Sequence, residues 1–359
     1  MRKRMVIVAL IFMLMSTIAL GQQTHLIDDM IKTMTIEEKV AQMFLARAPS
    51  SGALNQIEST QPGGYIFFAN HFEGKTPDNM REAFSSYQAA SKIPMLIAVD
   101  EEGGTVTRIS RYKAFRSAKY QSPRALFEAG GLHAVVTDAI EKSKFLKELG
   151  INFNLAPVCD IAVKKGEFMY SRSLGQDAKV TSHYISAVVS AMNQAGVASA
   201  LKHFPGYGGN ADTHTGLVRD KRTLSHFKER DLLPFEAGIK AGAGCILVSH
   251  NIVECLDEKN PASLSPEVHK LLREELGFEG VILTDDLYMG AIQQFVGTKQ
   301  AAVLAVEAGN DLLCSTSYQT QFGAVLEAVQ SGRIDEARID ESVGRILQWK
   351  TDLGILSAQ

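Results

Sequence analysis

Residues 280–286, Gly-Val-Ile-Leu-Thr-Asp-Asp, form a short apolar run that ends in two adjacent carboxylates. Other short runs of the chain repeat this pattern, and longer amphipathic segments separate them. A continuous apolar run of this length is typical of a strand that is buried on both faces of a parallel sheet. We therefore predict strands over 40–47, 64–70, 95–100, 152–158, 198–203, 245–250, 281–284 and 311–315.

The segments between these runs have the spacing of amphipathic helices. We predict helices over 77–90, 134–149, 179–195, 266–276 and 299–308. The capping-box pattern Thr35-x-x-Glu38 predicts a helix start near the N-terminus, and Asp340 is predicted to begin the last helix.

Eight strands that alternate with helices predict an α/β fold in which a parallel sheet closes into a single (β/α)8 TIM-type barrel. The chain has 359 residues, enough for one such barrel with insertions, and no Pro/Ser-rich linker divides it. We therefore expect one domain over residues 22–359.

The N-terminus differs from the rest of the chain. Arg2, Lys3 and Arg4 precede an apolar run over residues 5–20, and Ala19 and Gly21 supply the small residues expected near a cleavage point. This pattern is typical of a secretory signal peptide over residues 1–21, which would export the protein to the periplasm or the medium. An uncleaved membrane anchor is the alternative, although the run is short for a span of about 20 residues.

Composition and charge exclude several classes of protein. Hydrophobic residues make up 45% of the chain, which excludes a disordered protein. The net charge of −3 leaves no basic excess for a nucleic-acid partner. The four cysteines are too scattered for a disulfide scaffold, so we expect them to be small buried residues. We expect a monomer that needs no metal or organic cofactor and has no stable membrane association after signal cleavage.

Polar side chains follow nearly every predicted strand. In a parallel barrel these ends emerge at one face, which is where barrel enzymes place their chemistry. The sequence therefore predicts a cluster of ionisable groups on that face, drawn from Asn70, His71, Asp100, Glu101, Asp160, Lys202, His203, His250, Asn251, Asp285 and Asp286.

The loop after the strand at 198–203 reads Lys-His-Phe-Pro-Gly-Tyr-Gly-Gly-Asn-Ala-Asp-Thr-His-Thr-Gly over residues 202–216. Its glycines allow the backbone to move and to approach a ligand closely. Asp212 and His214 are two residues apart, so the carboxylate can hold the imidazole and raise its basicity. Two other interpretations remain: His203, Asp212 and His214 could bind zinc, or Asp212 could be a turn residue of a structural loop.

Other segments add candidates to the same face. Asp285 and Asp286 are adjacent on an extended end and point opposite ways, so one should face the barrel axis and the other should cap the following helix. Asp100 lies at the end of a predicted strand, just before a turn that contains glycines. Arg172 lies in a loop among small hydroxyl residues, where its guanidinium group is suited to contact oxygen ligands.

Taken together, these motifs resemble glycoside hydrolase family 3, and in particular its bacterial, NagZ-like β-N-acetylglucosaminidase (β-hexosaminidase) branch. The resemblance covers residues 26–356 and is carried, in order, by Asp100-x-Glu-Gly-Gly104, Ser171-Arg-Ser, Lys202-His-Phe-Pro-Gly, Asp212-x-His214, Pro261-Ala-Ser-Leu-Ser265 and Thr284-Asp-Asp-Leu-x-Met289.

The resemblance implies roles for individual residues. Asp285 takes the place of the nucleophile, and His214 that of the general acid/base, with Asp212 behind it. The sugar-binding positions of the family fall on Asp100, Arg172, Lys202, His203 and His250. Tyr207 departs from the pattern, because many members carry a histidine in this Pro-Gly-x-Gly turn.

The activity implied by the resemblance is that of an exo-acting retaining β-N-acetylhexosaminidase that removes terminal β-linked N-acetylglucosamine, with peptidoglycan fragments as substrates. A family 3 β-glucosidase is one alternative. An N-acetylglucosaminide phosphorylase is another, because a histidine that has donated its proton is neutral and does not repel phosphate. A non-catalytic muropeptide-binding barrel is the alternative of another class.

Overall fold

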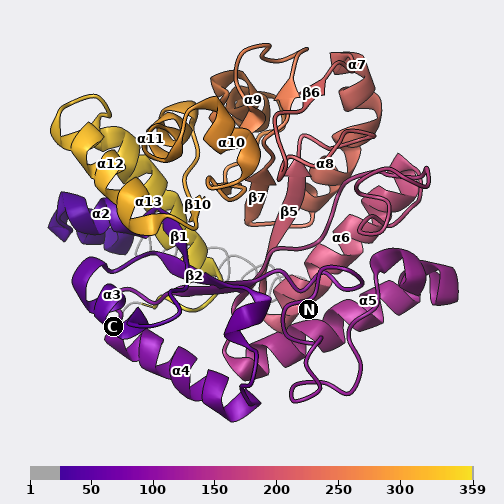
Figure 1. Ribbon diagram of the computed structural model, residues 1–359, viewed down its shortest axis with the longest axis horizontal. Coiled ribbons are helices and arrows are strands. Elements are labelled where there is room, and N and C mark those ends of the chain that lie inside the picture. Colours follow the sequence, from indigo (N-terminus) through magenta and orange to yellow (C-terminus); the bar gives the residue numbers. More distant parts are fainter. Residues whose placement is uncertain (1–24, 358–359) are drawn as a thin grey trace, which may run out of the picture.

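Eight parallel strands follow one another around a barrel, and the helices form a ring outside it (Figure 1). The computed structural model describes residues 25–357, so the predicted signal peptide lies outside the described residues. The neighbour order is β10-β1-β2-β3-β4-β5-β7-β9, and a parallel bridge between Leu283 and Leu312 joins the two end strands. The strands are β1 (Phe44–Arg47), β2 (Gly64–Phe67), β3 (Leu96–Val99), β4 (Phe153–Asn154), β5 (Ala198–Phe204), β7 (Cys245–Val248), β9 (Val281–Thr284) and β10 (Leu313–Ser315). The predicted (β/α)8 barrel is confirmed.

Helices precede, separate and follow these strands in the chain. Those with both ends among the described residues are α2 (Ile36–Gln42), α3 (Ala53–Thr60), α4 (Pro77–Ala90), α5 (Pro123–Leu149), α6 (Ala178–Ala195), α7 (Leu224–His226), α8 (Leu233–Lys240), α9 (Pro266–Lys270), α10 (Gly290–Phe295), α11 (Thr298–Ala308), α12 (Tyr318–Gln330) and α13 (Glu336–Asp352). Short 3-10 or π segments are η1 (Ala69–His71), η2 (Phe227–Asp231), η3 (Ala262–Leu264) and η4 (Leu271–Glu275), and β6 (Arg219–Asp220) pairs with β8 (Ile252–Val253) outside the barrel.

Several predicted boundaries agree with the structure. The strand over 281–284 and the helix over 77–90 have the predicted bounds. The capping box at Thr35 is present, with the Glu38 side chain accepting from the Thr35 amide at 3.0 Å. These boundaries were predictable because a local signal, either a run of β-branched residues or a cap, sets each of them.

Other boundary predictions were wrong; the strand predicted over 152–158, for example, is limited to Phe153–Asn154. Residues 40–42 form the last turn of helix α2 and Met43 is its C-cap, so β1 begins only at Phe44. The strand was predicted to begin at residue 40 because a buried helix turn and a buried strand are both apolar. Helix α5 begins at Pro123 rather than 134 and changes direction at Gly130 and Gly131. Asp340 lies inside α13, whose N-cap is Asp335, and it forms an ion pair with Lys39 instead.

The strands are buried on both faces, as their continuous apolar sequences require. Cys159, Cys245 and Cys314 are buried as predicted, but Cys255 is exposed, so the prediction was wrong for this residue. Between residues 25 and 357, no helix has the length and apolar character needed to cross a bilayer.

Candidate active site

A pocket of about 520 Å³ opens at the carboxyl ends of the barrel strands. Its walls come from the loops after nearly every strand, including the glycine-rich loop after β5. Seven of the eight predicted site residues line this one pocket: Asp100, Arg172, Lys202, His203, Asp212, His214 and Asp285. The structure therefore brings together residues that lie up to 185 positions apart in the sequence, counted from Asp100 to Asp285.

Lys202 is a buried cation among the residues that line the pocket. It is 2% exposed, and its Nζ lies 2.7 Å from Asp100 Oδ1 and 2.7 Å from Glu102 Oε1. Burial alone would lower the pKa of Lys202, but the two carboxylates outweigh it and raise the pKa above its ordinary value. The ammonium group is therefore held charged in a fixed position.

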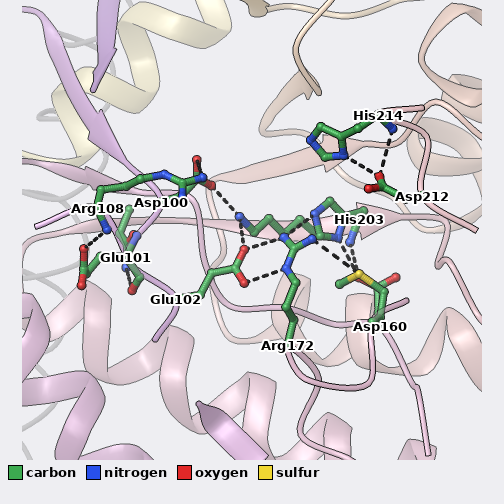
Figure 2. Close-up of polar contacts among 12 residues, drawn as sticks. Asp100, Glu101, Glu102, Arg108, Asp160, Arg172, His203, Asp212 and His214 are labelled. Carbon is green, nitrogen blue, oxygen red and sulfur yellow. Dashed lines mark hydrogen bonds and ion pairs between the residues drawn. The ribbon is translucent and has the colours of Figure 1, made fainter. Parts of the chain in front are cut away.

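Glu102 connects this lysine to Arg172. The Arg172 Nε and Nη2 atoms donate to the two Glu102 oxygens at 2.9 Å and 2.6 Å (Figure 2). Although burial opposes ionisation, Arg172 and Lys202 hold the pKa of Glu102 far below its usual range. Asp100 extends the network, because its Oδ1 contacts Lys202 and its Oδ2 lies 3.6 Å from Arg108 Nη2. Such a buried network is rigid and keeps its donors fixed.

His203 is fixed in one tautomer by its two partners. Its Nδ1 lies 2.7 Å from Asp160 Oδ2, and Arg172 Nη2 donates to its Nε2 at 3.1 Å (Figure 2). A guanidinium group can only donate, so Nε2 holds the lone pair and Nδ1 holds the proton. Asp160 also accepts from the His203 amide at 3.1 Å. Asp160 and Arg172 therefore fix the orientation of the His203 ring in the pocket wall.

Asp285 follows β9 directly and is tied into the barrel rim. Its amide donates to the Val248 carbonyl at 3.0 Å, and its Oδ1 accepts from the Asp286 amide at 2.9 Å. Burial would raise the pKa of the Asp285 carboxyl, but nearby imidazoles, foremost His250 and His203, outweigh it and the pKa is lowered. Asp285 is therefore an ionised carboxylate in the pocket, as a nucleophile must be.

Asp286 has a structural position. Its carboxylate accepts from the Tyr288 amide at 3.0 Å, from the Thr316 amide at 3.1 Å and from the Thr316 hydroxyl. Burial raises its pKa. The prediction that one of the two aspartates caps the next helix was wrong in detail, because Met289 is the N-cap of α10 and Asp286 closes the preceding turn.

Asp212 and His214 form a hydrogen-bonded pair in the glycine-rich loop. Asp212 Oδ1 lies 2.5 Å from His214 Nδ1 and accepts from the His214 amide at 2.9 Å. The two side chains are 32% and 58% exposed, and Figure 2 shows them apart from the buried network around Glu102. Because Nδ1 is engaged by the carboxylate, Nε2 is the nitrogen available for proton transfer.

The zinc interpretation has no support in this arrangement. Both ring nitrogens of His203 are engaged by Asp160 and Arg172, so it does not join Asp212 and His214 in a ligand set. Over residues 25–357, no group of three His, Cys, Asp or Glu side chains is placed to hold a metal ion.

His250 lies behind the pocket wall and does not line the pocket. Its Nε2 donates to the Asp286 carbonyl at 3.0 Å, and its Nδ1 lies 2.7 Å from the Ser263 hydroxyl. Burial lowers the pKa of the His250 ring. The structure thus places this predicted residue in contact with the segment that carries Asp285, rather than in the cavity.

Glu102 and Asp160 contact site residues, although their sequence context alone does not indicate these roles. Both residues follow the ends of predicted strands, and Asp160 belongs to the predicted cluster of ionisable groups. Their position after a strand was therefore the one sequence signal that pointed to the site. The sequence does not show which of the consecutive acids Asp100, Glu101 and Glu102 directs its carboxylate toward Lys202 and Arg172. Glu101 instead accepts the backbone amides of Arg108 and Ile109 at 2.7 Å and 2.8 Å and holds the turn.

Comparisons with known proteins show the family to which the chain belongs. The model of the glycosyl hydrolase family 3 N terminal domain matches residues 35–349. The chain is 32% identical to beta-hexosaminidase A of Pseudoalteromonas piscicida over 326 residues, which cover 82% of this chain but only 54% of that protein. It is 30% identical to a beta-hexosaminidase of Xanthomonas oryzae, with 80% of this chain and 86% of that one covered. The solved family 3 beta-N-acetylglucosaminidase of Paenibacillus superposes with a TM-score of 0.84 at 34% identity and covers 91% of this chain and 64% of its own.

Proposed function

Since this chain belongs to glycoside hydrolase family 3, we propose that it is an exo-acting, retaining β-N-acetylhexosaminidase that hydrolyses terminal β-linked N-acetylglucosamine. One observation carries the proposal: Asp285 and the Asp212–His214 pair line the same pocket. Hydrolysis with retention needs a nucleophile at the anomeric carbon and a proton donor at the leaving oxygen. These residues supply both groups.

In the first step the ionised Asp285 attacks the anomeric carbon and forms a glycosyl ester. His214 donates its Nε2 proton to the departing oxygen, and Asp212 stabilises the charged ring and its orientation. In the second step His214 takes a proton from water, which attacks the ester and releases the sugar with its original configuration.

The buried network is suited to hold the sugar that is released. Asp100, Lys202 and Arg172 present fixed acceptors and donors on the pocket wall, and His203 presents its ring. Groups that are already oriented need little reorganisation when the substrate binds. We assign Asp100, Lys202 and Arg172 to hydroxyl and acetamido contacts, His203 to packing its ring against the sugar, and Glu102 to holding Lys202 and Arg172 in place.

The first test is release of 4-methylumbelliferone from the N-acetyl-β-glucosaminide and from the β-glucoside. We expect turnover of the acetylated substrate, loss of turnover in Asp285→Ala and strongly slowed turnover in His214→Ala. A preference for the glucoside would favour a β-glucosidase, and no turnover by well-folded protein would favour a binding barrel. A sugar phosphate formed on addition of phosphate would identify a phosphorylase.

The nucleophile is tested separately by trapping. An activated 5-fluoro N-acetyl-β-glucosaminide should leave a covalent adduct whose mass maps to the peptide that carries Asp285. In NMR, the first product should be the β-anomer. A β-anomer without any adduct on Asp285, combined with strong inhibition by a thiazoline analogue, would indicate assistance by the substrate's acetamido group instead.

The natural substrate and the site of action are also proposals. We propose that peptidoglycan fragments are cleaved outside the cytoplasm after removal of residues 1–21. Incubation of purified muropeptides with the protein should release free N-acetylglucosamine, and N-terminal sequencing of the exported protein should begin at Gln22. Protein that retains Met1 in the membrane fraction would instead support an uncleaved anchor.

A further inference from the structure

Thr213, the residue between Asp212 and His214, is the buried point of an otherwise exposed loop. Its neighbours on both sides are exposed or half-buried over residues 209–217, whereas Thr213 is 0% exposed. Elsewhere in the loop the Asn210 side chain donates to Asp220 Oδ2 at 2.6 Å, but Thr213 lies directly between the two residues of the pair. The contacts of Thr213 therefore decide where the Asp212–His214 pair lies.

The Thr213 hydroxyl lies 2.5 Å from the hydroxyl of Tyr207. Tyr207 is 1% exposed, and its ring packs edge-on against His203 with centroids 5.3 Å apart. Its amide also donates to Asp160 Oδ1 at 2.7 Å. Burial raises the pKa of Tyr207 well above its ordinary value, so the phenol keeps its proton and the contact is a neutral hydrogen bond. Tyr207 is thus a fixed part of the wall that holds His203.

The other side of Thr213 is tied to the segment that follows the nucleophile. The Ala291 amide donates to the Thr213 carbonyl at 3.2 Å. The backbone at Gly290 approaches so closely that an added Cβ would lie 2.5 Å from the His214 carbonyl oxygen. The loop is therefore held between the sugar-binding wall, through Tyr207, and the start of α10, through Ala291.

From these contacts we propose that Tyr207 is a positioning residue for the acid/base: its hydrogen bond to Thr213 sets the place of His214 over the pocket. The inference rests on the proposed function. Loss of the phenol hydroxyl removes the side-chain anchor and leaves the ring packing against His203 intact. Small misplacements of a reacting group are costly, because about 1 Å can reduce a rate by about 100-fold.

A leaving-group comparison tests this role. A 2,4-dinitrophenolate leaves without protonation, whereas methylumbelliferone and a second sugar need increasingly more help from an acid. For Tyr207→Phe we expect kcat/KM to fall about 10- to 100-fold on chitobiose and by less than about 3-fold on the dinitrophenyl N-acetyl-β-glucosaminide. The ratio kcat/KM is used because it reports the glycosylation step alone.

Two further variants give the test its controls. Thr213→Val should reproduce the same leaving-group pattern, and the double variant should be no worse than either single one, because both remove one bond. Tyr65→Phe is the matched control: this buried hydroxyl bonds to Ala53 O at 3.2 Å and to Gln56 Oε1 at 2.8 Å on helix α3. It should leave kcat/KM unchanged on every substrate.

The proposal is overturned if Tyr207→Phe is as active as the native protein on chitobiose, or if it loses the same factor on all leaving groups. An equal loss would place Tyr207 in sugar binding or in stability. The proposed function has its own indicator, since it fails if the native protein hydrolyses none of these substrates. If His214→Ala shows a steep dependence on the leaving group while Tyr207→Phe is unaffected, the proposed function stands and only the positioning role of Tyr207 is rejected.

Discussion

Two buried lysines at opposite ends of the barrel have opposite surroundings. Lys202, at the carboxyl ends of the strands, contacts Asp100 and Glu102, and its pKa is raised. Lys350 of α13 lies at the amino ends, where its Nζ donates to Gln42 Oε1 at 2.8 Å. No carboxylate of residues 25–357 pairs with Lys350, and burial lowers its pKa to about 7.

The difference separates a charge that serves chemistry from one that only affects stability. At the carboxyl ends, each buried cation is matched by carboxylates and aimed at a pocket. Lys350 has no carboxylate partner in the described part of the chain, so burying its amine opposes folding while it is protonated. Removing a buried charge should therefore be harmful where carboxylates pair with it and favourable where none does.

The largest effect is expected for Glu102→Gln. This change leaves Lys202 with Asp100 and removes the carboxylate that pairs with Arg172, and an uncompensated buried charge costs about 3 to 5 kcal/mol. We also expect kcat/KM to fall at least about 100-fold, since two sugar-binding groups lose their orientation. Urea unfolding and the methylumbelliferyl assay measure the two effects. A stable and fully active variant would contradict the role given to this network.

Lys350→Met is expected to stabilise the protein, by about 2 kcal/mol at pH 7. The folded pKa, about 7, lies below the ordinary 10.5, so the unfolded state binds more protons between these values. The free energy of unfolding of the native protein should therefore rise with pH across this window, by at most about 1.4 kcal/mol per pH unit. Below pH 7 both states are protonated and the penalty is complete.

Urea unfolding between pH 6 and 9 checks this slope, which the Lys350→Met variant should lack. Lys39, also buried at the amino ends, is the matched control because Glu336 and Asp340 lie 2.8 Å and 2.7 Å from its Nζ. Lys39→Met should destabilise the protein. If both substitutions shift stability in the same direction, the contrast between paired and unpaired lysines fails.

The sequence predicted the barrel because strands buried on both faces must be continuously apolar and because caps such as Thr35 are local. It also predicted which strand ends carry the site, since parallel strands all emerge at one face. The direction of each side chain was not predictable in the same way. Asp100, Glu101 and Glu102 are consecutive acids, and only the folded turn gives them three different partners.

The bond between Tyr207 and Thr213 could not be predicted for a related reason. It depends on the path of a glycine-rich loop, and glycine leaves that path open at the level of sequence. His250 gives the opposite lesson: its strand-end position was correctly read, but its hydrogen bond to the Asp286 carbonyl directs it away from the cavity. The position of a residue after a strand predicts that it lies near the pocket. Its hydrogen-bond and ion-pair partners in the folded protein decide whether its side chain enters the pocket.

A smaller effect is expected for Asp160→Asn, which tests how a histidine of the pocket wall is held. An amide at this position can no longer accept as strongly from His203 Nδ1, so the favoured tautomer is weakened. We expect KM to rise about tenfold, equivalent to about 1.4 kcal/mol, with a smaller change in kcat. Ser263→Ala, which removes the corresponding partner of His250, should change KM less because His250 does not line the pocket. Equal effects of the two variants would argue against this distinction.

The smallest effect is expected for Glu336→Gln, which repeats the chemical change of Glu102→Gln beside the buried Lys39. The Glu336 side chain is 56% exposed, and Lys39 keeps Asp340 as a partner. Solvent screens the lost charge, so the free energy of unfolding should fall by less than about 1 kcal/mol. Urea unfolding of both glutamine variants under one condition measures the ratio directly. If Glu336→Gln lowers the free energy of unfolding as much as Glu102→Gln does, then burial of the carboxylate does not determine how much its ion pair with lysine contributes to stability.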